Sequence, residues 1–210
     1  MTYTSDCYEI EYDSQNEGLV QDVAEALNQN LACVMAFLEL EKLDKKIPVK
    51  IHPTLESWRD FIITHGGRYQ DWVVGWVPHD TIHVLAYDQY ARIQSHQNDT
   101  LEDFQKVIIH ESVHFCHSQI CTNRLAFNSN FFFREGLATY LAEQPYNPKI
   151  NTDFPKDVIF DPMKFLQNTN DPYSVAQKLV RKVLGKVSHE QFLEYVRDPQ
   201  KLYDDWEKLQ

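Results

Sequence analysis

The spacing of apolar residues changes partway along this 210-residue chain, and that change constrains the fold more than any other feature. At 7–13, Tyr8, Ile10 and Tyr12 alternate with polar or charged neighbours, which is typical of a half-buried strand. Helical spacing first appears at residue 17, and from about residue 100 onward it is almost continuous. The pattern predicts an α+β fold, with a small N-terminal mixed sheet and its helices followed by a mainly helical C-terminal half.

The first half is expected to run in the order β, α, β, α, β, β. The expected elements are a strand at 7–13, a helix at 17–46, a strand at 48–52, a helix from about 54 to 65, and strands at 72–77 and 81–87. Thr54 is a favourable N-cap for the second helix, and Gly66 and Gly67 can end it. Pro78, His79 and Asp80 join the last two strands, which predicts a hairpin.

The second half is expected to hold helices at 100–119, 130–144, 172–184, 188–197 and 199–210. Residues 145–171 contain four prolines and little periodicity, and this segment is longer than a passive connection usually is. We expect it to be a loop that wraps the surface. The whole chain, 1–210, is expected to form one domain, with an α/β part at 1–120 and a helical part at 121–210.

Charge and composition exclude several classes of protein. The 20 Lys and Arg against 31 Asp and Glu give a net charge of −11, which repels phosphate backbones and anionic lipids. The sequence has no GxxxxGK or GxGxxG loop for phosphate. No apolar run approaches the roughly 20 residues that span a bilayer, and no secretion signal is apparent. We therefore expect a cytoplasmic protein that binds neither nucleic acid nor membranes.

The number and spacing of the cysteines do not indicate a disulfide framework or a metal-binding CxxC motif. Cys7, Cys33, Cys116 and Cys121 are too few for a set of disulfide staples and show no CxxC spacing. Cys116 and Cys121 would pair only if a helix ended between them. Free thiols are the expectation.

The helix expected from residue 100 contains an HExxH sequence, His110, Glu111, Ser112, Val113 and His114. Residues four apart on a helix lie on the same face, so the two imidazoles can bind one cation. Glu111 lies beside that face, where its carboxylate can reach a water on the metal. A tetrahedral catalytic zinc needs a third protein ligand and an open fourth position.

The segment Phe132–Glu143 follows the HExxH sequence at the separation that one group of enzymes shows between its two metal-binding segments. It contains FFREGLATY, an aromatic-x-x-Glu-Gly-x-Ala-x-Tyr pattern centred on Glu135 and Gly136. Together, 107–117 and 132–143 resemble the gluzincin zinc peptidases, the thermolysin-like and aminopeptidase-like group, and 171–184 is the third segment of the resemblance. The resemblance implies a zincin-like fold and one Zn²⁺ held by His110, His114 and Glu135. It also implies that Glu111 is the general base and that the chain is a zinc metallopeptidase.

His117 is the alternative third ligand, because it lies seven residues after His110 on nearly the same helical face. Three ligands from one straight helix surround a metal poorly, so Glu135 is favoured. The pattern with a third His six residues after the second fails, since that position is Ile120. The remaining six histidines lack ligand spacing and are expected to be ordinary residues: His52, His65, His79, His83, His96 and His189.

Two neighbours of Glu135 have expected roles. Gly136 removes a side chain where two helices must approach closely. Thr139, one turn beyond Glu135, could orient His110 through its second ring nitrogen.

The expected reaction is hydrolysis of a peptide bond by a metal-activated water, with Glu111 moving the proton from water to the leaving amine. Gluzincins place a Tyr or His from a later helix against the oxyanion, so the resemblance points to Tyr173 as the second catalytic residue, with Tyr140 and Tyr146 as rivals. A peptide or protein substrate would add a strand to an exposed edge of 81–87, above Trp72 and Trp76, unless that segment is a fully paired core hairpin.

Other classes of function remain open. One is a catalytically inactive gluzincin-like module that binds zinc or a protein partner. A deformylase also uses HExxH, but it takes a Cys ligand upstream of the helix, and no Cys lies between Cys33 and His110. An acidic helical interaction protein with a chance motif is the third alternative.

Overall fold

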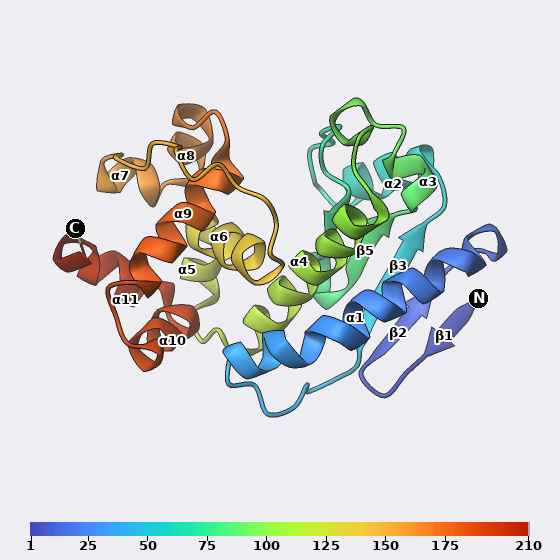
Figure 1. The fold of residues 1–210 in the computed structure, drawn as a ribbon, viewed down its shortest axis with the longest axis horizontal. Coiled ribbons are helices and arrows are strands. Elements are labelled where there is room, and N and C mark those ends of the chain that lie inside the picture. Colours follow the sequence, from blue (N-terminus) through green and yellow to red (C-terminus); the bar gives the residue numbers. More distant parts are fainter. Residues whose placement is uncertain (210) are drawn as a thin grey trace. The chain divides into compact units, whose positions relative to one another are not determined.

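The computed structural model describes residues 1–209 and confirms the α+β class, with one small mixed sheet in the N-terminal part (Figure 1). The chain divides into two compact units, the first at Met1–Cys116 and the second from His117 onward. The boundary between the units lies close to residue 120, where the two parts of the single predicted domain meet, and the single domain itself stays a prediction. Within residues 1–209, none of the helices combines the length and the apolar character that crossing a membrane requires.

The sheet of the first unit has five strands in the order β1-β2-β3-β5-β4. The strands are β1 (Thr2–Thr4), β2 (Tyr8–Glu11), β3 (Ile47–His52), β4 (Gly75–Trp76) and β5 (Ile82–Leu85). The three central strands run parallel, while β1 and β4 pair antiparallel at the two ends. The predicted hairpin is confirmed as β4 and β5, and β1 was not predicted because three residues are too few to show a period.

The prediction that 81–87 offers an exposed edge for substrate is wrong. Strand β5 lies between β3 and β4 and is hydrogen-bonded on both sides. Parallel β3 covers the side of β5 that the sequence left open, because the crossover through α2 (Leu55–Thr64) returns the chain to the same sheet. The short strand β4 is the end of the sheet on this side.

The alternation of side chains gives the sheet two different faces. Ile10, Val49 and Val84 are buried on the face where Tyr8 also donates a hydrogen bond from its hydroxyl to Ala24 O of α1 (Glu17–Phe37). Helix α4 (Leu101–Ile120) lies along α1, and Gln105 Nε2 donates to the carbonyl of Asp22 (Figure 1). The helices α1 and α4 therefore cover this face.

The opposite face is covered by α2 and is rich in histidine. Lys50 pairs with His83 in the register of β3 and β5, so these side chains share the second face with His52, two residues along. Phe61 of α2 stacks on His83, with ring centroids 3.9 Å apart. Trp76 of β4 pairs with His83 of β5 in the strand register, and its ring packs edge-on against that of Phe61. Gly75, the other residue of β4, therefore faces α4.

Helix α1 ends nine residues before the predicted end. Leu38 is buried, and Glu39 takes a left-handed conformation with φ of 51°. The N–H of Glu39 donates to Ala36 O and the N–H of Leu40 to Met35 O, which is the pairing of a Schellman motif. Glycine usually occupies the left-handed position, so a glutamate there left no signal in the sequence.

The predicted signals at the ends of α2 are confirmed. Thr54 Oγ1 accepts from the N–H of Ser57, and Ser57 Oγ accepts from the N–H of Thr54, so the two form a reciprocal capping box. Gly66 has φ of 79°, a conformation that glycine adopts without steric cost, and the chain leaves the helix there.

The second unit is helical, as predicted. It contains α5 (Arg124–Ser129), α6 (Phe131–Leu141), α7 (Lys156–Ile159), α8 (Pro162–Asn168), α9 (Pro172–Leu184), α10 (His189–Arg197) and α11 (Pro199–Asp205). The segment 145–171, predicted as a loop, includes α7 and α8, which are too short to show periodicity. Asp161 caps α8, and Pro162 occupies its first turn.

Helices α6 and α9 pack against each other at unusually close range. A Cβ atom at Gly136 would lie 2.4 Å from the carbonyl oxygen of Ala176 and 2.8 Å from Val180 Cγ2. The predicted reason for a glycine at 136 is confirmed. The prediction of free cysteines is also confirmed for the described residues, with Cys7 and Cys33 exposed and Cys116 and Cys121 buried.

Candidate metal centre

Helix α4 begins with a second reciprocal cap. The N–H and the hydroxyl of Thr100 both donate to Asp103 Oδ2, at 2.8 and 2.7 Å, and the N–H of Asp103 donates to Thr100 Oγ1. These hydrogen bonds lower the pKa of the Asp103 carboxyl. The charged carboxylate in the first turn also interacts favourably with the helix dipole. Phe104 and Ile108 are fully buried below it, so the start of the helix is fixed in position.

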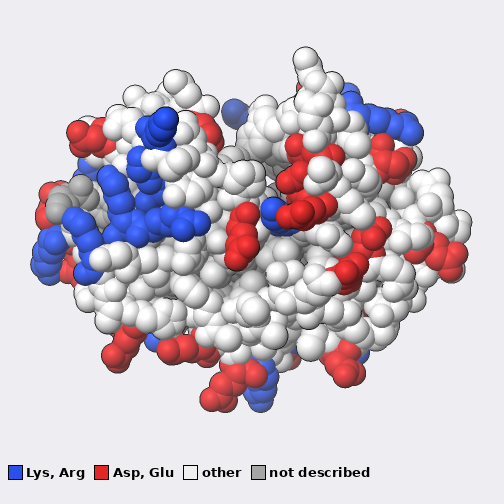
Figure 2. Space-filling view, viewed as in Figure 1, with Lys and Arg blue, Asp and Glu red and all other residues white. Residues whose placement is uncertain are grey.

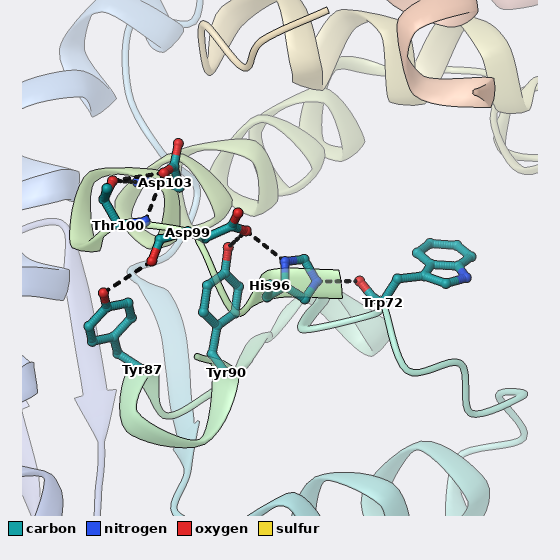
Figure 3. A network of polar contacts seen from close by, with 7 residues as sticks. All are labelled: Trp72, Tyr87, Tyr90, His96, Asp99, Thr100 and Asp103. Carbon is teal, nitrogen blue, oxygen red and sulfur yellow. Dashed lines mark hydrogen bonds and ion pairs between the residues drawn. The ribbon is translucent and has the colours of Figure 1, made fainter. Parts of the chain in front are cut away.

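A network of polar contacts connects the start of α4 to the segment before β4 (Figure 3). Asp99 Oδ2 accepts from the Tyr90 hydroxyl at 2.6 Å and lies 2.7 Å from His96 Nδ1. The other ring nitrogen of His96 lies 3.1 Å from the carbonyl oxygen of Trp72. Burial, followed by the contact with Asp99, raises the pKa of Tyr90. Because Trp72 lies three residues before β4, the network ties the end strand to the motif helix.

The two motif histidines face each other one turn apart on α4. His110 Nε2 and His114 Nε2 are 3.0 Å apart, and the rings meet edge-on at a centroid distance of 4.7 Å. Two nitrogen ligands at about 2.0–2.1 Å from a tetrahedral zinc lie roughly 3.4 Å apart. The pair therefore fits a shared metal with a small rearrangement.

Glu111 lies against the end strand of the sheet. A Cβ atom at Gly75 would come within 2.6 Å of Glu111 Oε1 and 2.9 Å of its Cγ. Only a residue without a side chain allows β4 to approach this carboxylate so closely. No sequence pattern singles out Gly75, because its role depends on a contact with Glu111, which lies 36 residues further along the chain.

Glu135 lies in the second turn of α6. Asn130 begins that helix by accepting from the N–H of Phe133 through its side-chain oxygen. Glu135 Oε1 accepts from Arg134 Nε and from one of its terminal nitrogens, at 3.1 and 2.9 Å. This two-point ion pair holds one carboxylate oxygen in place, and it was not predicted.

The predicted ligand set lies close enough together that it could hold a metal ion. Among residues 1–209, one group of three or more His, Cys, Asp and Glu side chains does so, and it consists of His110, His114 and Glu135. One ligand atom from each lies within 4.8 Å of the others. Two imidazoles and a carboxylate are a donor set that suits zinc.

His117, the alternative ligand, is engaged elsewhere. Its side chain is fully buried, and its Nε2 lies 2.9 Å from the carbonyl oxygen of Val196, to which it donates. Its ring packs edge-on against Phe127 and Phe133. These contacts give His117 a structural role between α4, α5 and α6 and argue against it as a ligand.

The roles suggested for Thr139 and Tyr173 stay predictions. The Thr139 hydroxyl lies 2.9 Å from Glu135 O and 3.1 Å from Gly136 O, in its own helix, so its proton is used there and only its lone pairs remain for another partner. Tyr173 lies in the first turn of α9, with its ring 6.1 Å from that of Phe131. The rival tyrosines Tyr140 and Tyr146 both face the guanidinium of Arg181.

Comparison with known proteins adds no relative, since the chain matched no protein-family model, no curated protein and no solved structure. The candidate site therefore depends on the chemistry and geometry of its own side chains.

Proposed function

We propose that this chain is a zinc-dependent peptidase of the gluzincin type, and that it hydrolyses peptide bonds with Glu111 as general base. The observation that carries the proposal is the combination of one His-His-Glu ligand group with a neighbouring carboxylate. His110, His114 and Glu135 supply the group, and Glu111 lies between the two histidines in sequence. A structural zinc site closes all four positions with protein ligands, whereas three ligands leave one position for water.

The side chains of the candidate site have three different roles in the proposed reaction. His110, His114 and Glu135 would hold the ion, which when bound lowers the pKa of a water and polarises a substrate carbonyl. Glu111 accepts the proton of the attacking water and delivers it to the leaving nitrogen, so that it ends the cycle as a carboxylate. Arg134 donates to Glu135 Oε1, which would orient the carboxylate for metal binding.

An extended peptide would bind along β4. That strand is at the end of the sheet, so among the described residues it has a strand neighbour on one side, β5. Backbone pairing with an edge strand is independent of side-chain sequence and suits a peptidase substrate. Gly75 places this edge next to Glu111, so a paired backbone would run close to the proposed base.

The test is the Glu111→Gln variant, assayed on an unfolded protein such as casein and on a quenched fluorescent peptide library. The amide keeps the shape of the side chain but cannot accept the proton, so we expect kcat to fall by about 10²–10⁴ while bound zinc is unchanged. Glu102→Gln is the matched control, because Glu102 is an exposed residue of the same helix paired with Lys106. Cleavage by Glu111→Gln at the wild-type rate would contradict the mechanism.

The same assay separates the enzyme from an inactive zinc-binding module. If wild-type protein binds one zinc and cleaves none of these substrates, the module is the better interpretation. If the wild type cleaves and Glu111→Gln does not, the peptidase is supported.

A further inference from the structure

Helix α9 has an unusual charge for this chain. Residues 1–116 contain 19 acidic and 8 basic residues and so account for the whole net charge of −11, while the 12 acidic and 12 basic residues that follow balance. Between 172 and 189 there are four Lys and Arg and no Asp or Glu. Figure 2 shows Lys and Arg side chains gathered where Figure 1 draws α9. A positive patch therefore lies on an acidic protein.

A cavity of about 320 Å³ opens within this patch. Three cationic side chains line it, those of Arg181, Lys182 and Lys186, together with the apolar side chains of Leu179, Val183 and Trp206. No acidic side chain is among the described residues that line it. The cavity thus combines a cationic part with an apolar part.

The positive charges of Arg181 and Lys182 are not cancelled by a carboxylate of the described residues. The Arg181 guanidinium lies 4.7 and 4.8 Å from the ring centroids of Tyr140 and Tyr146, and Lys186 Nζ donates to the carbonyl of Leu209. Neither Arg181 nor Lys182 forms an ion pair with a carboxylate of the described residues. The aromatic rings that Arg181 faces are neutral partners, so Arg181 and Lys182 give this part of the cavity a positive potential.

We propose that this cavity binds an anionic group joined to a short apolar body, either a carboxylate or a phosphate monoester. The volume is at the small end of the range for ligand pockets, about 300–1,000 Å³, which suits a small ligand. The anion would be placed by Arg181 and Lys182, and the apolar body would lie against Trp206 and Leu179. Favourable interaction with the helix dipole explains cations near the end of α9, but it does not explain why they surround a cavity with an apolar wall.

The proposal is tested by isothermal titration calorimetry of the whole chain with octanoate and octyl phosphate. We expect one saturable site per chain for at least one of these anions, and the tighter of the two identifies the anionic group. Octanol and octylammonium have the same apolar body without a negative charge and are expected not to bind. This measurement involves neither zinc nor cleavage, so its outcome is independent of the proposed function.

A pair of charge reversals locates the site. Lys182 is exposed, so Lys182→Glu should leave the fold intact, as thermal unfolding would show, and should weaken binding by about tenfold or more. Lys201→Glu makes the same charge change in the same unit, on α11 and outside the cavity lining, and is expected to bind like the wild type. The proposal is overturned if neither anion saturates, if octylammonium binds as well, or if Lys182→Glu binds like the wild type.

Discussion

Two pairs of histidines in this molecule have the same nitrogen separation but different surroundings. His52 Nε2 and His83 Nδ1 are 3.0 Å apart across β3 and β5, and His110 Nε2 and His114 Nε2 are also 3.0 Å apart along α4. The first pair is packed against an aromatic side chain, since Phe61 contacts both rings. The second pair belongs to a group with a carboxylate, Glu135.

Two close imidazoles do not by themselves indicate a metal site. Burial, followed by the charge of Lys50, lowers the pKa of His52 to about 4. Burial, followed by the neighbouring His52 and Lys50, lowers the pKa of His83 to about 3. Neither histidine belongs to a potential metal-binding group among residues 1–209. The β3–β5 pair is neutral and structural, and a third, anionic donor distinguishes the pair on α4.

The largest expected effect is on metal binding. His114→Asn shortens the side chain so that no atom reaches the position of Nε2, and we expect bound zinc to fall from one per chain to near zero. His83→Asn retains a polar atom near the position of Nδ1, which faces His52, and is expected to leave the stoichiometry unchanged. Metal analysis after gel filtration measures both. Equal losses in the two variants would remove the distinction between the pairs.

A smaller effect is expected at the strand that faces Glu111. Gly75→Ala places a Cβ atom 2.6 Å from Glu111 Oε1, so the carboxylate must move. We expect kcat to fall about tenfold with zinc retained, because a general base works only within hydrogen-bonding reach of its proton. The matched control is Gly18→Ala, where a Cβ atom would meet nothing within 4 Å. Wild-type kcat in Gly75→Ala would show that this contact does not position the base.

The smallest effect concerns the pH dependence of stability. The pKa values of His52 and His83 are lowered to about 4 and 3 in the folded state, whereas unfolded histidine titrates near 6.5. As the pH falls below about 6.5, the unfolded state takes up protons first, so the free energy of unfolding decreases from there toward pH 4.

His83→Asn removes one of the two groups, so we expect a shallower decrease in that variant. Urea unfolding of metal-free protein at pH 8, 6.5, 5.5 and 4.5 measures it, and the values at pH 8 give the effect of the substitution alone. Parallel curves for the two proteins would contradict a neutral, half-buried His83.

The sequence predicted the parts of the fold that depend on local signals. Thr54, Gly66 and the period of two around Ile10 each act within a few residues, and the predicted elements there are confirmed. The end of α1 was missed because Glu39 occupies a position where glycine is usual. The place of β5 inside the sheet depends on the return of the chain through α2, and no residue of β5 encodes it.

In the candidate site, too, the residues marked by local sequence signals were predicted, and the contacts made only on folding were not. His110 and His114 follow from helical spacing alone, whereas Glu135 required a second segment and a resemblance. The contact of Gly75 with Glu111 and the ion pair of Arg134 with Glu135 are apparent only once the chain is folded. The pairing of His52 with His83 was also missed, since residues 31 apart in sequence meet only through strand register.

The most direct test of the account is the number of zinc ions bound per chain in the wild type and in Glu135→Ala, measured by atomic absorption on dialysed protein. Two imidazoles and one carboxylate acting together predict one zinc in the wild type and a large loss in the variant. A wild-type chain that takes up no zinc, or a Glu135→Ala variant that retains it in full, would contradict the proposed centre.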